Sequence, residues 1–286
     1  MVLLAGAAAV LSSRADASVS LRREQCLITV NGHKTDLEPQ GAVIIGSRAF
    51  VSARVLTYLG ATYSFDASRR VLSAASGDPA RQLPVTMINR WLDGAVIAYP
   101  YLPIRAAAQA LGWQAKWRSS WEKHPDLGRI KVHSIALEKA MPGPPGPPPT
   151  WDELFSQHAE GGTVFDNLTV TMRARVDARR PRERFYVCVV SAELSRRGGG
   201  AIHSGNYALF VEDEGGGVVG VEGMAQSECK WPHGTLNPSG IGNWGEQPNA
   251  LFIFPPEVRL RRLIYSDGIR SFAIPFSATL AAPNPR

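Results

Sequence analysis

Tryptophans and basic residues stand close together at two places in the first half of the chain. Arg90 is followed by Trp91, and Trp121 lies between Arg118 and Lys123. An exposed indole ring offers a flat apolar face to a sugar, and a neighbouring cation attracts anionic groups. The sequence therefore predicts that these five residues form a ligand face for a sugar or a polyanion.

The alternative for any tryptophan is a place in the hydrophobic core. Trp113, Ala115 and Trp117 alternate with Gln114 and Lys116, as expected for a strand with one buried face. We therefore expect Trp113 and Trp117 to point inward. Trp91 and Trp121 are the better candidates for an exposed surface.

The cysteines and histidines form no metal-binding pattern. Cys26, Cys188 and Cys229 include no Cys-x-x-Cys pair, and no histidine follows them at the spacing of a zinc site. Cys188 and Cys229 lie in the same half of the chain and could form a disulfide in an oxidising compartment. Two buried free thiols are the alternative.

Other short motifs have simpler structural readings. The glycine-rich segment 215–220 fits a dinucleotide-binding pattern formally, but a strand and not a helix follows it, so it predicts a hairpin turn. The adjacent acids Glu212, Asp213 and Glu214 predict a solvated turn, with a weak calcium site as the alternative. We predict no catalytic residue, no metal ligand and no cofactor.

The basic charge of the chain lies in its first half. Residues 1–149 contain 17 Lys and Arg against 10 Asp and Glu, whereas residues 150–286 contain 14 against 15. A basic module is typical of proteins with an anionic partner, and a merely solubilising surface is the alternative. We expect the partner to be a cell-wall polymer or another envelope protein, and not nucleic acid.

The N-terminal residues 1–24 have the form of a secretory signal. An apolar run from Met1 to Leu11 precedes Ala15-Asp16-Ala17, a small-x-small cleavage pattern. No basic residue precedes the apolar run, which suggests a truncated signal, and a flexible terminus is the alternative. We expect export to the cell envelope or beyond, and no transmembrane segment apart from this one.

A proline-rich linker at residues 139–150 divides the rest of the chain in two. Its run from Met141 to Pro149 favours an extended spacer. We predict one domain at residues 25–138 and a second at residues 151–286.

The first domain contains one structural unit written twice, at about residues 26–76 and 79–135. In each copy a hairpin leads to a short apolar helix, which ends at Gly60 or Gly112, and a strand pair follows. From the arginine to this glycine, copy one (Arg54) is a residue shorter than copy two (Arg105). The repetition predicts the same arrangement of elements in both.

These residues resemble the copper amine oxidase N-terminal-like domain, a repeat module of bacterial exported and surface proteins. The matching segments are Val30-Asn31-Gly32, Phe50 to Arg54, Leu59 to Ala61 and Phe65-Asp66 in copy one, and Tyr101 to Arg105, Leu111 to Trp113 and Lys116 to Arg118 in copy two. The resemblance implies a stalk-like α+β unit without oxidase chemistry. No two histidines stand in a His-x-His pair, so no copper site is carried over.

The second domain contains about six strands separated by Gly, Pro and Asn turns, which is typical of a β-sandwich. It loosely resembles the Ig-like accessory domains of bacterial lipoproteins. We therefore predict an α+β first domain, with an antiparallel sheet curled on short helices, and an all-β sandwich. The predicted function is non-catalytic binding or scaffolding in the cell envelope, so we expect no enzyme. The alternative is a hydrolase-type enzyme whose site lies between the two domains.

Overall fold

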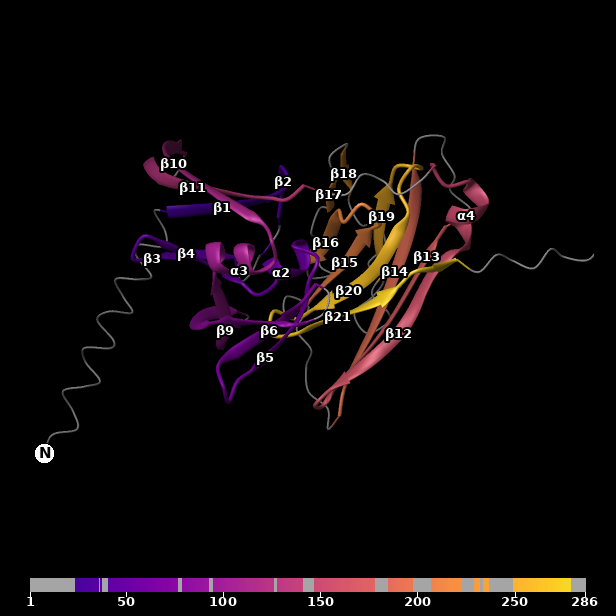
Figure 1. The fold of residues 1–286 in the computed structure, drawn as a ribbon, viewed down its shortest axis with the longest axis horizontal. Coiled ribbons are helices and arrows are strands. Elements are labelled where there is room, and N and C mark those ends of the chain that lie inside the picture. The colour runs from indigo at the N-terminus through magenta and orange to yellow at the C-terminus, as the bar shows by residue number, and fades with distance from the viewer. Residues whose placement is uncertain are drawn as a thin grey trace, which may run out of the picture.

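The computed structural model describes most of the chain from Glu24 onward (Figure 1). The described residues are 24–35, 37, 41–76, 79–92, 95–125, 128–140, 147–177, 185–197, 207–222, 229–231, 234–236 and 249–278. The predicted signal segment, apart from Glu24, and the centre of the predicted linker lie outside them. The side chains of Arg90, Trp91 and Cys229 also lie outside the described part.

The first half contains eleven strands and two helices among its described residues. These are β1 (Glu24–Val30), β2 (His33–Lys34), β3 (Ala42–Ile45), β4 (Arg48–Ser52), α2 (Val55–Tyr58), β5 (Thr62–Asp66), β6 (Val71–Ala75), β7 (Arg81–Pro84), β8 (Thr86–Leu92), β9 (Ala95–Pro103), α3 (Ile104–Ala110), β10 (Gln114–His124) and β11 (Gly128–Glu138). The second half, as far as it is described, consists of α4 (Trp151–Ser156), β12 (Gln157–Phe165), β13 (Leu168–Val176), β14 (Tyr186–Arg196), β15 (Ala208–Asp213), β16 (Val218–Glu222), β17 (Cys229–Trp231), β18 (Gly234–Leu236), β19 (Asn249–Phe254), β20 (Leu260–Ser266), β21 (Ser271–Pro275) and β22 (Ser277–Ala278).

The prediction of an α+β first domain is wrong, because the described chain is mainly β. Strands account for 65% of it, and its three helices α2, α3 and α4 have only 4, 7 and 6 residues. The apolar spacing identified the helices, but each of the two in the first half ends after one or two turns at a glycine. Helices this short depend on the strands that they pack against.

Three sheets form the first half, and each of them contains strands of both copies. Strands β3-β4-β9-β8 form one sheet, in which β4 of copy one pairs with β9 of copy two. Strands β5-β6-β7 form another. In the third, β10-β11-β1-β2, the first strand of copy one lies parallel to the last strand of copy two. The two copies therefore complete each other.

Both helices end in the same way. Gly60 and Gly112 each have φ of 76°, a left-handed conformation that favours glycine. Each donates its N–H to the carbonyl three residues earlier, and the next residue donates to the carbonyl five residues earlier, at 2.9 Å for Ala61 and 2.8 Å for Trp113. This is a Schellman motif, which satisfies the last helical carbonyls.

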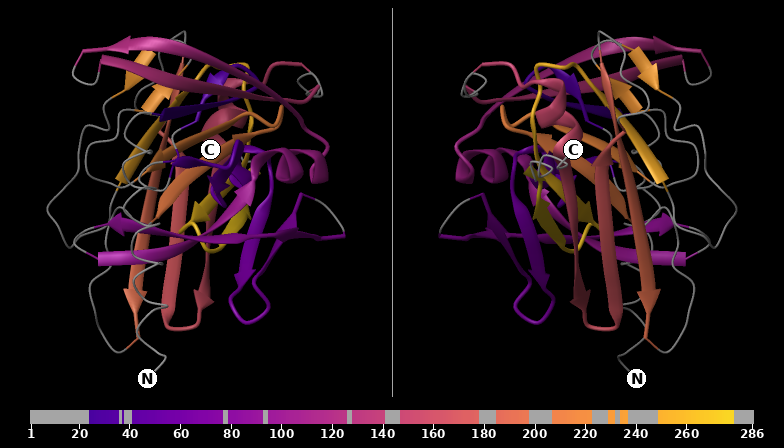
Figure 2. Two further views of the ribbon diagram at one scale, coloured as in Figure 1. Left: turned by 90° about the vertical axis from the view of Figure 1, so that its left-hand side faces the viewer. Right: turned by 90° about the vertical axis from the view of Figure 1, so that its right-hand side faces the viewer.

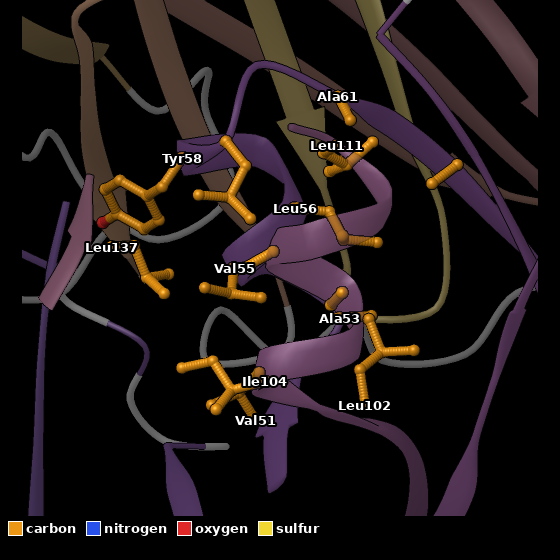
Figure 3. Close-up of a cluster of buried hydrophobic side chains, with 14 of the residues drawn as sticks. Val51, Ala53, Val55, Leu56, Tyr58, Ala61, Leu102, Ile104, Leu111 and Leu137 are labelled. Atoms are coloured by element: carbon orange, nitrogen blue, oxygen red, sulfur yellow. The ribbon is translucent and has the colours of Figure 1, made fainter. Parts of the chain in front are cut away.

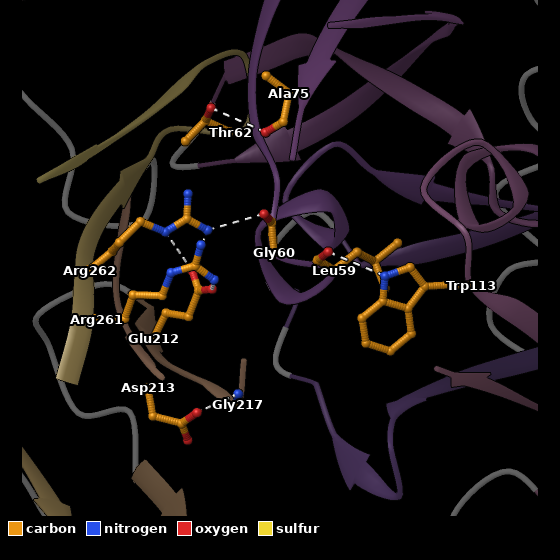
Figure 4. Close-up of polar contacts among 10 residues, drawn as sticks. All are labelled: Leu59, Gly60, Thr62, Ala75, Trp113, Glu212, Asp213, Gly217, Arg261 and Arg262. Carbon is orange, nitrogen blue, oxygen red and sulfur yellow. Dashed lines mark hydrogen bonds and ion pairs between the residues drawn. The ribbon is translucent and has the colours of Figure 1, made fainter. Parts of the chain in front are cut away.

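The two helices lie side by side in one hydrophobic core (Figure 3). Val51, Leu56, Leu102 and Ile104 are among the buried side chains between them. The indole N–H of Trp113 donates to the carbonyl of Leu59 at 3.3 Å (Figure 4), so copy two also closes the end of the helix of copy one.

Two sheets of the second half face each other in a sandwich-like arrangement. The five-stranded sheet has the order β19-β14-β13-β12-β22, and the four-stranded sheet has the order β16-β15-β20-β21. A second hydrophobic core, which includes Val170, Cys188 and Tyr265, fills the space between them. We call the four-stranded sheet the interface sheet, because its other face packs on the first half (Figures 1 and 2).

Alternate residues of β15 show the two faces of the interface sheet. Leu209 and Val211 belong to the core of the sandwich, whereas Ala208 and Phe210 belong to the core of the first half. Phe210 meets Tyr58 of α2 edge to face, with 5.2 Å between the ring centroids. The two halves of the chain therefore share a hydrophobic core.

Candidate functional site

Trp121 and Lys123 of the predicted ligand face lie on one side of the long hairpin β10–β11. In the strand register Trp121 is opposite Lys131, and Lys123 is opposite Arg129. Side chains of directly opposed residues lie on the same face of a sheet, so these four gather there. We call Trp121, Lys123, Arg129 and Lys131 the hairpin face.

The indole of Trp121 is the most prominent part of the hairpin face. It is 58% exposed, although an indole of this size is usually well buried. The guanidinium carbon of Arg129 lies 5.4 Å from the centre of its ring, within the range of a cation–π interaction. Lys123 and Arg129 are also exposed, and no ion pair joins either of them to a carboxylate of the described chain. The face therefore combines an open aromatic ring with positive charge.

Arg118 points to the opposite side of the same hairpin. Successive side chains of a strand alternate between the two faces, and Arg118 is three positions from Trp121. Its neighbour on that side, Lys116, forms an ion pair with Glu138 at 2.5 Å. The structure thus brings together Trp121 and Lys123 but separates Arg118 from them.

Arg90 and Trp91 belong to a different sheet. They lie on β8, where their backbones pair with Ile97 and Val96 of β9. In Figure 1, β9 and β10 lie on opposite sides of helices α2 and α3. The five predicted residues therefore do not come from one sheet.

A pocket of about 360 Å³ opens at the base of the same hairpin side. Its wall from the hairpin sheet is made by Ala115, Trp117 and Ile135, and Arg48 and Arg105 line it from β4 and α3. The remaining lining is mostly apolar. This volume is typical of a site for one small organic molecule.

Trp117 is held in a fixed orientation on the pocket wall. Its indole N–H donates to Nδ1 of His133 at 3.1 Å, and the two rings meet edge to face at 5.4 Å. Because Nδ1 accepts this bond, the proton of the neutral imidazole lies on Nε2. Trp113 is buried as predicted, whereas Trp117 is only half-buried and lines the pocket.

The two arginines of the pocket bring positive charge to its rim. Arg48 and Arg105 are both exposed. Within the described residues neither forms an ion pair with a carboxylate, in contrast to Arg173, which lies 2.8 Å from Glu160. An anionic group in the pocket would meet two uncompensated guanidinium groups.

The acidic segment of the second half does not form the predicted solvated turn. Glu212 is 2% exposed and pairs with Arg261 at 3.2 Å and with Arg262, whose Nε lies 2.7 Å from Oε2 (Figure 4). Arg262 also donates to the carbonyl of Gly60 at 3.1 Å and so joins the two halves. Glu212 is therefore a structural ion-pair partner at the interface.

Asp213 closes the predicted hairpin turn of β15 and β16. Its Oδ1 accepts the N–H of Gly217 at 2.8 Å, and burial raises the pKa of this carboxyl above its usual range. Within the described residues no group of three or more His, Cys, Asp or Glu is placed to hold a metal ion.

The thiols of Cys26 and Cys188 are both free. Burial raises the pKa of the Cys26 thiol to about 12 and also raises the pKa of Cys188. A thiol with a raised pKa carries little thiolate at neutral pH, so neither residue has the character of a nucleophile.

Comparisons with known protein families, with curated proteins and with solved structures gave no match. No helix in the described part of the chain is both long enough and apolar enough to cross a membrane. The resemblance to the copper amine oxidase N-terminal-like domain therefore rests on the residues quoted for it.

The sequence reasoning missed Arg48, Arg129 and Lys131 as binding candidates. Arg129 and Lys131 stand in a segment that was predicted as a strand, and they alternate with the apolar Ile130 and Val132. Pairing this strand with β10 in register would have placed them beside Lys123 and Trp121. For Arg48 no local pattern points to the pocket, because the other walls come from residues more than 50 positions away.

Proposed function

We propose that this chain is a non-catalytic exported protein of the cell envelope that binds an anionic polymer through the hairpin face. The observation that carries the proposal is the exposed indole of Trp121 among Lys123, Arg129 and Lys131. We also propose that the first half is a stalk-like module of the copper amine oxidase N-terminal-like kind. Export rests on the signal-like residues 1–24.

The arrangement of the hairpin face suits an extended ligand. Trp117 and Trp121 lie on the same side of β10, four residues apart, so their Cα atoms are separated by about 13 Å along the strand. A chain of anionic sugars could contact both rings while its charges meet the flanking cations. Such binding gains from electrostatic attraction and is weakened by salt.

The interface between the halves supports a structural role for the second half. Tyr58, Phe210 and Ile264 pack there in one core, and the carboxylate of Glu212 is bound by two arginines. These contacts hold the first half against the sandwich. They give no support to the alternative of an enzyme with a site between the domains.

The test uses the full chain, because the halves share a core. Wild type, Trp121→Ala and Lys123→Ala/Arg129→Ala are compared in sedimentation binding to peptidoglycan that carries teichoic acid and to peptidoglycan stripped of it. We expect each variant to bind the anionic polymer at least about tenfold more weakly, because an aromatic contact or two charges are lost.

Arg118→Ala is the matched control, since Arg118 is an exposed arginine on the other side of the same strand. We expect it to bind nearly as wild type does. Equal binding by wild type and Trp121→Ala, or no binding of wild type to either polymer at low salt, contradicts the proposal.

A further inference from the structure

The two copies place equivalent residues around their helices. In the antiparallel pairing of β4 with β9, Val51 of copy one lies opposite Leu102 of copy two, and these two residues hold equivalent places in the repeat. Arg54 and Arg105 each follow three residues later, so they correspond to each other. Aligning the helix-ending glycines makes Tyr63 correspond to Ala115, and Phe65 to Trp117. Three residues that line the pocket of copy two thus have counterparts in copy one.

In copy one this surface is covered by the second half of the chain. The backbone N–H of Tyr63 donates to Oγ of Ser271 at 2.8 Å, and its hydroxyl lies 2.6 Å from Oγ of Ser266. Ser64 forms a β-bridge with Arg270. The turn between β20 and β21 therefore lies on the surface that corresponds to the pocket.

The covering turn contains a carboxylate, that of Asp267, which accepts the backbone N–H groups of Ile269 and Arg270 and pairs with the Arg270 side chain at 3.2 Å. Burial raises the pKa of Tyr63, the charge of Asp267 raises it further, and the charge of Arg54 lowers it. The same two charges act on Tyr265 in the same directions. Arg54 is fully buried. Copy one thus encloses its arginine, whereas Arg105 of copy two is exposed.

In copy two the corresponding surface is the pocket, with Arg105 and Arg48 at its rim. Of the lining residues only Ser47 and Gln109 carry uncharged side chains that form hydrogen bonds, apart from the indole of Trp117, whose N–H is already used by His133. A sugar needs many such partners, so this lining favours an apolar body.

We propose that the pocket binds a small carboxylic acid whose body is one apolar ring or a short apolar chain. The carboxylate lies between Arg48 and Arg105, and the apolar body packs against Trp117, Ala115 and Ile135. This site uses none of the four residues of the hairpin face, although it shares the ring of Trp117 with the extended ligand proposed above.

The test is a titration of the ¹⁵N-labelled full chain with phenylacetate, followed by NMR. The indole N–H signal of Trp117, identified by its loss in Trp117→Phe, should shift on binding. We expect Arg48→Gln/Arg105→Gln to weaken binding at least about tenfold, since two charge-assisted contacts are lost. The neutral analogue phenylacetamide should bind wild type more weakly by a similar factor.

Three control variants test whether phenylacetate binds in this pocket and not elsewhere on the protein. Ala106→Leu fills the pocket from an exposed position of α3 and should abolish the shift while the protein stays folded. Arg118→Gln removes an exposed arginine on the far side of β10 and should change nothing. Trp121→Ala should leave phenylacetate binding intact, so that failure here is distinguished from failure of polymer binding.

Several results overturn the proposal. They are the absence of a Trp117 shift at millimolar phenylacetate, equal binding of phenylacetamide, and an unchanged affinity in the double arginine variant. Stronger binding of phenylphosphate would replace the carboxylate by a phosphate ligand. Binding of a short acidic peptide but not of phenylacetate would replace the small acid by a protein partner.

Discussion

Helices α2 and α3 come from equivalent positions of the repeat but meet different surroundings. All four residues of α2 are buried, because the interface sheet covers the helix through Phe210 and Ile264. In α3 only Ile104, Ala107 and Ala108 are buried, and the opposite side of the helix is open to solvent. The same unit thus serves as core in copy one and as a surface with a pocket in copy two.

This difference shows that burial in a duplicated unit depends on what is attached to it. Arg54 and Arg105 have the same place in the pattern, yet one is enclosed and the other is exposed. Changes that weaken the cover of copy one should therefore cost stability, whereas matching changes in copy two should cost much less.

The largest effect is expected for Phe210→Ala. The ring fills the space between the interface sheet and α2, and it occupies the place where a Cβ on Gly220 would stand. Its removal leaves a cavity in a shared core and should lower the free energy of unfolding by about 4 kcal/mol. Urea denaturation measures this loss. In contrast, a loss below about 1 kcal/mol would show that the halves do not depend on this contact.

A smaller effect is expected when the cation at each helix end is removed. Arg262 contacts the carbonyl of Gly60 and the buried Glu212, so Arg262→Ala should cost about 3 kcal/mol by leaving this carboxylate with Arg261 alone. Lys139 contacts the carbonyl of Leu111 at 3.3 Å in copy two and is exposed, so Lys139→Ala should cost about 0.5 kcal/mol. Thermal unfolding measures how much stability each of the two variants loses. Equal losses would contradict the difference between the copies.

The smallest difference is expected between Gly60→Ala and Gly112→Ala. Both glycines have φ of 76°. A Cβ added at Gly60 meets no atom within 4 Å, and the atom nearest to a Cβ added at Gly112 is Nζ of Lys139 at 4.0 Å. Each substitution should cost about 1 kcal/mol of backbone strain. Chemical denaturation of the two variants should give the same loss within error, and a clear inequality would mean that the two helix ends are not equivalent.

Local sequence patterns were enough to predict some elements. The apolar spacing before Gly60 and Gly112 located both helices of the first half and their ends, because a left-handed C-cap depends on one residue type. The Gly215–Gly217 turn was predicted as a hairpin for a similar reason. These features are decided by neighbours in the sequence.

Contacts between distant parts of the chain were not predictable in this way. Tyr63 is bound by Ser266 and Ser271, more than 200 positions away, and the ring of Phe210 occupies the space where a Cβ of Gly220 would stand. A sequence pattern also does not show that β15 is buried on both faces, since its residues simply read as apolar. The same holds for the pocket, whose walls come from β4, α3 and β10.

The parallel pairing of β1 with β11 has a mechanical consequence. Glu24 is opposite Lys131, and Val30 is opposite Leu137, so the chain enters this pair at one end and leaves it at the other. A force between the start of β1 and the end of β11 therefore slides the two strands past each other and loads all their hydrogen bonds at once. Forced unfolding is governed by the rate of such a step. The second half, which follows β11 in the chain, is thus connected to the N-terminal end of β1 through a pair of strands that resists tension.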